Sequence, residues 1–188
     1  MSLLPTPSQT VGPYFAIGLG DAIKAELVEP SDPDAVRLHG VVLDGQGDPV
    51  VDAMLEIWQA NRAGRYAHPE DTREHIPLEE GFDGFGRCGT DSEGRYEFVT
   101  IKPGAVPAPG GVPQAPHIEV SVFARGLLKR LATRAYFPDE AEANEQDPIL
   151  GLIADPAERS TLVAQPDDGG LRFDIRLQGD GQTVFFSV

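Results

Sequence analysis

The residues best suited to chemistry lie in one short stretch, 116–126, whose alternation of apolar and polar residues predicts a β-strand. Alternate side chains of a strand point to the same face. One face is apolar and should lie on a hydrophobic core: Ile118, Val120, Val122 and Ala124. The opposite face is mostly polar and should line a pocket or meet a partner: His117, Glu119, Ser121, Phe123 and Arg125.

His117 and Glu119 are two residues apart on that polar face, with about 6 to 7 Å between their Cα atoms. At this separation an imidazole and a carboxylate can bind one metal ion, although a hydrogen-bonded or solvated pair has the same spacing. Arg125 would stand about 26 Å from His117 along an unbroken strand. If both ends of the strand are functional, they must therefore belong to two different pockets.

The composition of the chain limits what it can bind. Its 188 residues, 40% hydrophobic and 24% charged, suit one globular domain with its own core. The formal net charge of −15 should repel nucleic acid and anionic membranes, so an anionic substrate would need a local cation. The single cysteine, Cys88, rules out an internal disulfide. Neither a signal peptide nor a membrane-spanning segment is evident, and we expect a soluble protein of the cytoplasm.

Frequent glycine and proline, 21 and 17 residues, favour short strands and many loops over long helices. We expect β-hairpins over 36–59 and 90–102, separated by a long loop over 61–87. Trp58, among strongly apolar neighbours, should lie in the core. The alternation over 171–178 predicts the clearest half-buried strand of the chain.

Helices should be few and short, one near 138–145 and one over 155–164, each with a proline at or near its start. Residues 1–35 contain five prolines and should lack regular structure, yet they are too apolar for a free tail. We therefore expect 1–35 to form an arm that packs on a partner chain. Residues 36–188 should form the β-sandwich of a single, mainly β domain with long loops.

Several separate motifs match one family in their order and spacing. They are Leu-Glu-Ile-Trp-Gln-Ala-Asn at 55–61, Ala-Gly-Arg-Tyr at 63–66, Gly-Phe-Gly-Arg at 84–87, Thr-Asp at 90–91, Ile-Lys-Pro-Gly at 101–104 and Ala-Pro-His-Ile at 115–118. In these motifs the chain resembles the intradiol ring-cleavage dioxygenases over most of its length. Four further segments look more narrowly like the alpha chains of members that have two kinds of chain: 6–10, 12–14, 123–126 and 173–176.

The resemblance implies a ferric site held by two tyrosines and two histidines, and these positions can be compared one by one. The first tyrosine matches Tyr66, and the second matches Val106, which cannot coordinate a metal. The two histidines match His117 and Glu119. Only two of the four ligands remain, so the resemblance implies a chain that binds no metal of its own and keeps these positions as vestiges.

The same resemblance implies a partner, a beta chain that holds Fe(III) and the catalytic residues. With O₂, the pair would open 3,4-dihydroxybenzoate between its hydroxyls to 3-carboxy-cis,cis-muconate, in the β-ketoadipate pathway of aromatic catabolism. The two chains would form a higher-order hetero-oligomer. This chain would contribute five residues to the partner's substrate pocket, with the arginine near the substrate carboxylate: Thr10, Gly12, Pro13, Tyr14 and Arg125.

Other interpretations stay open on the residues alone. Tyr66 and Tyr14 can be ordinary hydrophobic anchors, and Arg125 can form a salt bridge at the end of a strand. The chain can be a self-sufficient dioxygenase for another acidic catechol, in which His117, Glu119 and a histidine of the long loop bind divalent iron. It can also be an assembly module with a sandwich fold and no chemistry.

Overall fold

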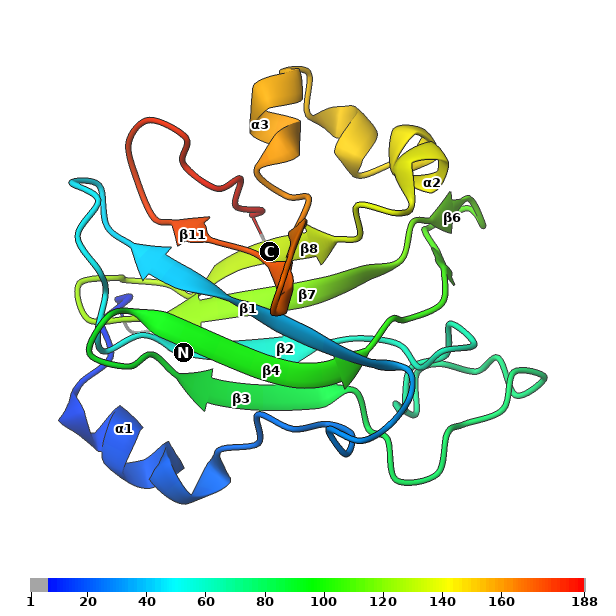
Figure 1. Ribbon diagram of the computed structural model, residues 1–188, viewed down its shortest axis with the longest axis horizontal. Helices are drawn as coiled ribbons and strands as arrows, with labels where there is room; N and C mark the ends of the chain where they lie inside the picture. Colours follow the sequence, from blue (N-terminus) through cyan, green and yellow to red (C-terminus); the bar gives the residue numbers. More distant parts are fainter. Residues whose placement is uncertain (1–6, 188) are drawn as a thin grey trace, which may run out of the picture.

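Short strands with alternating apolar residues assemble into two facing β-sheets, with the apolar side of each turned inward (Figure 1). The computed structural model describes residues 7–187. Within them strands predominate and every helix is short. The prediction of a mainly β sandwich with long loops and a few short helices is confirmed.

The first sheet contains the strand with the candidate residues, and all its neighbouring pairs are antiparallel. Its order is β3 (Phe85–Gly89), β2 (Met54–Trp58), β7 (His117–Phe123) and β8 (Leu131–Tyr136). The predicted apolar face of β7 is confirmed, because no side chain on it is more than 1% exposed: Ile118, Val120, Val122 and Ala124.

The expectation that Trp58 lies in the core is wrong. On β2 the fully buried residues are Leu55 and Ile57, and the period of two places Trp58 with Glu56 on the outer face. There the Trp58 indole stacks on the Tyr66 ring, with 5.9 Å between centroids and 10° between planes. Its apolar surface is covered by a loop aromatic instead of by the core.

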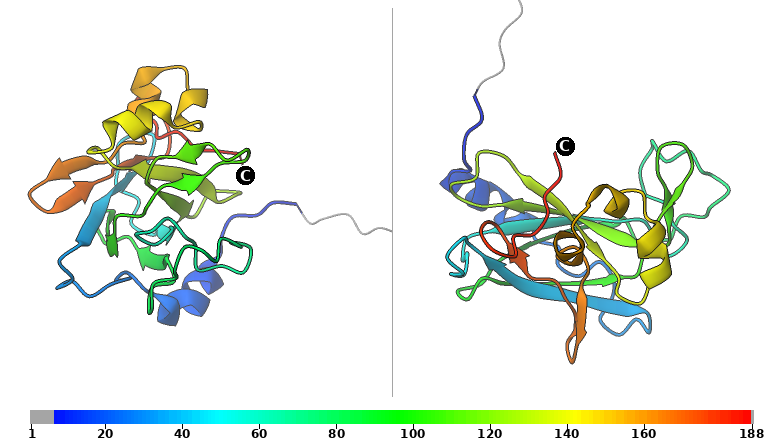
Figure 2. Two further views of the ribbon diagram at one scale, coloured as in Figure 1. Left: turned by 90° about the vertical axis from the view of Figure 1, so that its right-hand side faces the viewer. Right: turned by 90° about the horizontal axis from the view of Figure 1, so that it is seen from above.

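The second sheet is built around β1 (Ala35–Leu43). This strand pairs antiparallel with β4 (Arg95–Ile101) and parallel with both β10 (Gly170–Arg172) and β11 (Ile175–Arg176). The strand β9 (Gln165–Asp167) pairs with β10 and extends the sheet. Figure 2 shows the two sheets from the end and from above, with α2 and α3 on one side of the sandwich.

The strand predicted over 171–178 is divided in two. It breaks at Phe173, whose carbonyl accepts a hydrogen bond from the Tyr96 hydroxyl at 2.5 Å. The neighbouring Asp174 carboxylate accepts from the Val41 N–H at 3.1 Å, in the place of a strand-to-strand bond. Gly40 permits this approach, because a Cβ there would lie 2.1 Å from the Phe173 carbonyl oxygen.

Both predicted hairpins are wrong, although the turns within them are right. Gly47 and Gly94 adopt φ angles of 89° and 71° in tight turns, as glycine allows. Each turn, however, carries the chain from one sheet to the other, because β1 and β4 lie in the second sheet and β2 and β3 in the first. Turn chemistry is local, whereas the pairing of strands depends on packing across the core.

The N-terminal region contains a helix where the sequence predicts irregular structure. α1 (Pro13–Leu19) begins with proline at its first position, where the missing N–H loses no hydrogen bond. The 3₁₀ turn η1 (Gly20–Ala22) continues it. Within residues 7–187, no helix is long and apolar enough to cross a lipid bilayer.

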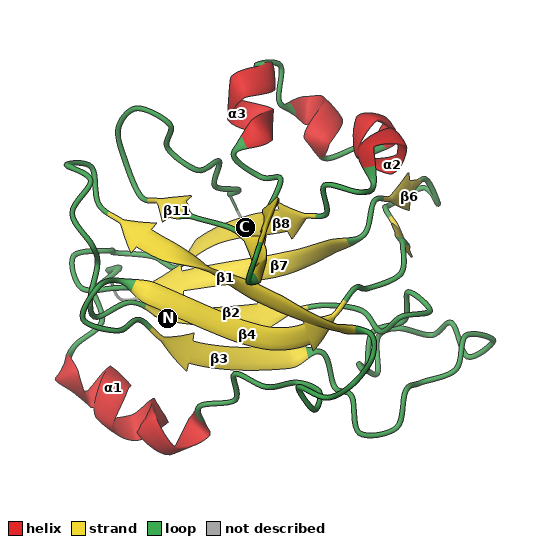
Figure 3. Cartoon of the chain, in the orientation of Figure 1, coloured by secondary structure: helices red, strands yellow, loops and turns green. Residues whose placement is uncertain are grey.

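Both predicted C-terminal helices are present in shorter form, as α2 (Ala141–Gln146) and α3 (Pro156–Ser160), with η2 (Leu150–Leu152) between them. Asp155 caps α3, since its carboxylate accepts from the Ala157 N–H at 2.8 Å. The loop before β7 also contains a two-stranded sheet, β5 (Val106–Pro107) and β6 (Pro113–Gln114). Figure 3 shows that loops link most of these elements.

Candidate functional site

The two groups of candidate residues lie at opposite ends of β7. His117 is its first residue, and Arg125 follows its last residue, Phe123, by two positions. In Figure 1 the first end lies beside the long loop between β2 and β3, and the second lies toward the N-terminal segment. Because β7 is unbroken between these ends, His117 and Arg125 cannot share one small site.

His117 is almost fully buried, and one of its ring nitrogens has a backbone partner. Nδ1 lies 2.7 Å from the Ala115 carbonyl oxygen, which can only accept, so Nδ1 carries the hydrogen. Nε2 has no hydrogen-bond partner among the described residues, and in the neutral ring it holds a lone pair. This tautomer, fixed by a backbone carbonyl, is the one in which a histidine binds metal through Nε2.

Glu119 faces Arg134 across the β7–β8 pair. Its Oε1 lies 2.7 Å from Arg134 Nη2 and 3.6 Å from His117 Nε2, and the second distance is too long for a hydrogen bond. Burial alone would raise the pKa of the Glu119 carboxyl, but the net direction is downward, and the Arg134 guanidinium at hydrogen-bond distance lowers it. Glu119 is therefore an ionised group that already has a cationic partner.

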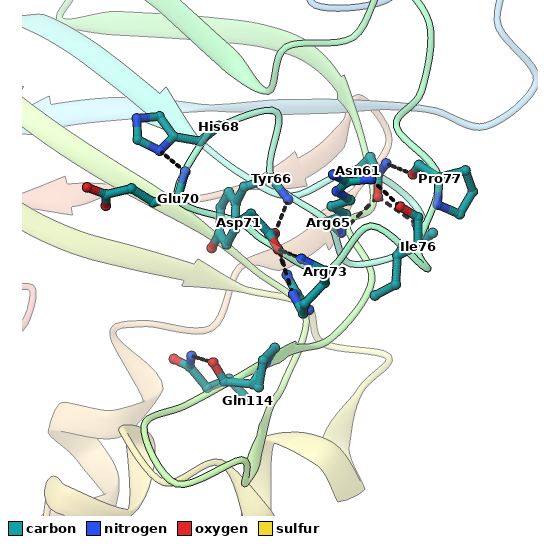
Figure 4. Close-up of polar contacts among 12 residues, drawn as sticks. Asn61, Arg65, Tyr66, His68, Glu70, Asp71, Arg73, Ile76, Pro77 and Gln114 are labelled. Carbon is teal, nitrogen blue, oxygen red and sulfur yellow. Dashed lines mark hydrogen bonds and ion pairs between the residues drawn. The ribbon is translucent and has the colours of Figure 1, made fainter.

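Tyr66 comes from the long loop, which is held in place by its own polar contacts (Figure 4). The Asp71 carboxylate accepts from the Tyr66 backbone N–H at 2.8 Å and pairs with the Arg73 guanidinium at 2.6 Å. Burial, and after it the negative charge of Glu119, raises the pKa of the Tyr66 phenol to about 12. The phenol is therefore neutral near pH 7.

Two cavities that share Trp58 and Tyr66 connect these residues. One, of about 440 Å³, also has Val106 in its wall, and the other, of about 530 Å³, has Glu119 and Arg130. The structure thus gathers Tyr66, Val106 and Glu119 at the end of β7 where His117 is buried. These three residues are far apart in the sequence, and only the fold brings them together.

At the second end of β7, the N-terminal segment packs on its own chain. The Thr10 hydroxyl accepts a hydrogen bond from the Gly126 N–H at 2.7 Å. The Phe15 ring on α1 lies 5.4 Å from the Phe123 ring at the end of β7. These two contacts join the arm to the strand that carries the other candidate residues.

Two large side chains of α1 remain exposed at this end. Gly12 precedes the helix and Pro13 opens it, so Tyr14 lies in its first turn, where 84% of its surface is exposed. Ile17 is 73% exposed one turn later. Arg125 is exposed as well. This end of β7 therefore presents an aromatic side chain, an aliphatic side chain and a cation to the solvent.

Comparison with known proteins identifies the family of this fold. A family model described as Dioxygenase matches residues 11–179. The protocatechuate 3,4-dioxygenase alpha chain of Pseudomonas putida is 45% identical, over 99% of this chain and 98% of its own length. The chain belongs to the intradiol dioxygenase family.

Other intradiol dioxygenases and related structures match as well. The protocatechuate 3,4-dioxygenase beta chain of Burkholderia cepacia is 43% identical, over 80% of this chain and 61% of its own. The solved dioxygenase domain of a carbohydrate-binding fusion protein from Streptomyces sp. SirexAA-E is 26% identical, with a TM-score of 0.57 over 84% of this chain and 88% of that domain. The resemblance carried by the motifs is thereby confirmed.

Intradiol dioxygenases are iron-dependent, but the residues at the first end of β7 do not fit a ferric ion. Trivalent iron favours hard, anionic ligands. Val106 offers no donor atom, and the Glu119 carboxylate is paired with a guanidinium. His117 Nε2 is a buried nitrogen without a hydrogen-bond partner among the described residues. Within residues 7–187, no three His, Cys, Asp or Glu side chains converge as they would around a metal.

Arg134 is the residue of this intradiol dioxygenase site that the sequence does not single out. Its place opposite Glu119 depends on the β7–β8 register, which no local pattern specifies. The sequence holds a weak signal for Arg134, because side chains alternate along a strand. Thr133 and Ala135, on either side of it, are buried in the structure, so Arg134 belongs to the opposite face of its strand. That face continues the polar face of β7.

Proposed function

We propose that this chain is the alpha chain of a protocatechuate 3,4-dioxygenase. In the assembly, a beta chain would hold Fe(III), and the ring of 3,4-dihydroxybenzoate would open between its hydroxyls with O₂ to give 3-carboxy-cis,cis-muconate. The alpha chain would contribute to the walls of the substrate pocket and to the hetero-oligomer. The proposed setting is the cytoplasm and the catabolism of aromatic acids.

One observation carries the proposal. A chain that matches an alpha chain over nearly its full length has, at the positions that the motifs align with the family's iron ligands, a donor set unsuited to ferric iron. Val106 is apolar and offers no donor atom, and the Glu119 carboxylate is bound by Arg134. The relatives also include a beta chain, which supports a division of labour between two chains.

The second end of β7 would serve the partner. Arg125 carries a positive charge that can meet the carboxylate of an acidic catechol through short, charge-assisted hydrogen bonds. Tyr14, with Gly12 and Pro13 before it, would lie against the ring, and Thr10 positions the segment through its bond to Gly126. The apolar side chains exposed on α1 suit burial at the interface with a beta chain.

Metal analysis and turnover test the proposal together. The chain should be purified alone and after co-expression with a beta chain that has both tyrosines and both histidines. We expect no stoichiometric iron and no ring opening from the chain alone. The co-purified pair should contain one iron per beta chain and open 3,4-dihydroxybenzoate.

Two results would contradict the proposal. One iron bound per chain without a partner, and lost in His117→Ala, would favour a self-sufficient dioxygenase. A stable complex with the beta chain whose turnover equals that of the beta chain alone, on every acidic catechol tried, would favour an assembly module.

A further inference from the structure

Arg134 lies at the centre of the first end of β7, among groups that accept hydrogen bonds. Its Nη2 pairs with Glu119 Oε1 at 2.7 Å, and its Nη1 donates to Gln114 Oε1 at 2.7 Å. The same Nη1 lies 3.3 Å from the Tyr136 hydroxyl. Only 15% of the Arg134 side chain is exposed, so water screens these contacts weakly.

The acceptors around Arg134 include two carboxylates. Glu119 contacts it directly, and Asp147 is linked to it through the Tyr136 hydroxyl, which donates to Asp147 Oδ1 at 3.2 Å. Asp147 is 1% exposed, and its other hydrogen bonds come from neutral backbone N–H groups. Among residues 7–187, Arg134 is the one lysine or arginine that pairs with Glu119.

His117 adds a third acceptor on the same side. Its Nε2 lies 3.6 Å from Glu119 Oε1 and has no hydrogen-bond partner among the described residues, and in the neutral ring this nitrogen is an acceptor. Two acceptors that face each other are stabilised by a nearby positive charge. The Tyr66 oxygen belongs to the same region, because Tyr66 and Glu119 line one cavity.

We infer that the Arg134 guanidinium supplies, from the chain itself, the positive charge that a metal ion would supply among Tyr66, His117 and Glu119. This role lies beyond the proposed function and does not depend on the partner chain. It has a direct consequence. Removal of the guanidinium should uncover a latent cation site with mixed nitrogen and oxygen donors, a set that suits a divalent transition metal.

Titration of the full chain with Co(II) at neutral pH tests the inference, by calorimetry and by the visible spectrum of bound cobalt. Wild type should bind no stoichiometric cobalt. Arg134→Met removes the charge and keeps much of the side-chain volume, and this variant should bind about one equivalent, at least about tenfold more tightly than wild type. Addition of His117→Ala or Glu119→Gln to Arg134→Met should abolish the gain.

Two matched variants separate charge from other effects. Arg134→Lys keeps the positive charge and should bind no more cobalt than wild type. Arg130→Met removes an arginine from the cavity that Tyr66 and Glu119 line, but that arginine bonds to the Ser121 hydroxyl and to no carboxylate of residues 7–187, so the variant should also behave as wild type. A folded Arg134→Met chain without added cobalt affinity would overturn the inference and leave the proposed function intact. Stoichiometric cobalt bound to the wild-type chain would contradict both the inference and the proposed function.

Thermal unfolding is a second measurement, and it still tests the inference if Arg134→Met is too unstable for the cobalt titration. That variant leaves Glu119 without its cation, and its Tm should fall by roughly 5 to 10 °C. The double variant with Glu119→Gln removes both charges and should recover most of the loss. If the double variant is as unstable as Arg134→Met, the arginine acts through packing and the inference is wrong.

Discussion

Arg125 Nε lies 3.0 Å from Asp52 Oδ2, yet 79% of the arginine side chain is exposed. An ion pair in this setting contributes little to stability, because water and salt screen it. The guanidinium therefore can exchange Asp52 for another anion at small cost. Its position beyond the end of β7, close to the N-terminal segment, supports the proposed contact between Arg125 and a substrate carboxylate in an assembly.

Replacement of Arg125 should change substrate preference. In the complex with the beta chain, Arg125→Ala should lower kcat/KM for 3,4-dihydroxybenzoate by about 10-fold to 150-fold, because a shielded charged hydrogen bond is worth roughly 1.5 to 3 kcal/mol. Unsubstituted catechol lacks the carboxylate and should lose much less. Asp52→Asn is the matched control and should leave both rates near wild type. Equal losses on both substrates would show that Arg125 acts through packing or assembly.

The two aromatic residues at the start of α1 should have separable effects. Phe15 packs on Phe123, so Phe15→Ala should lower the Tm of the chain alone, by an amount that reflects roughly 0.5 to 1.5 kcal/mol for the aromatic pair in addition to the lost apolar burial. Tyr14 is exposed, so Tyr14→Ala should leave that Tm unchanged and weaken binding to the beta chain or raise KM in the complex. Differential scanning calorimetry and a pull-down titration measure the two effects. A fall in Tm for Tyr14→Ala as large as for Phe15→Ala would mean that Tyr14 serves its own chain.

The faces of β7 can be predicted from the sequence, because alternation along a strand is local and a buried face tolerates no slip. On β2 the same alternation places Trp58 on the outer face with Glu56. The prediction that Trp58 lies in the core rests instead on its apolar neighbours in the sequence, and it is wrong. The turns at Gly47 and Gly94 are equally local and are right. Their strand partners are wrong, since they depend on how the two sheets pack.

The candidate site shows the same division. Tyr66, Val106, His117 and Glu119 are identified by motifs, which need no geometry. The pairing of Glu119 with Arg134 comes from the β7–β8 register, and the raised pKa of Tyr66 comes from burial and from the charge of Glu119. Neither can be read from spacing along the chain, because both depend on segments that only the folded structure brings together.

The ionisation of Tyr66 should report on this site at alkaline pH. Its pKa in the folded chain is raised to about 12, against about 10 in an unfolded chain, so the unfolded state releases the proton first as the pH rises. The stability that the neutral phenol contributes is therefore fully present below pH 10 and is lost between about pH 10 and pH 12. An ultraviolet titration of wild type minus Tyr66→Phe isolates this phenol, and we expect its transition near pH 12 or together with unfolding. Arg134→Met removes a nearby positive charge that lowers this pKa, so in that background the transition should move upward. A transition of Tyr66 at or below pH 10 in the folded chain would contradict the raised pKa and the effect of burial and of Glu119 from which it is argued.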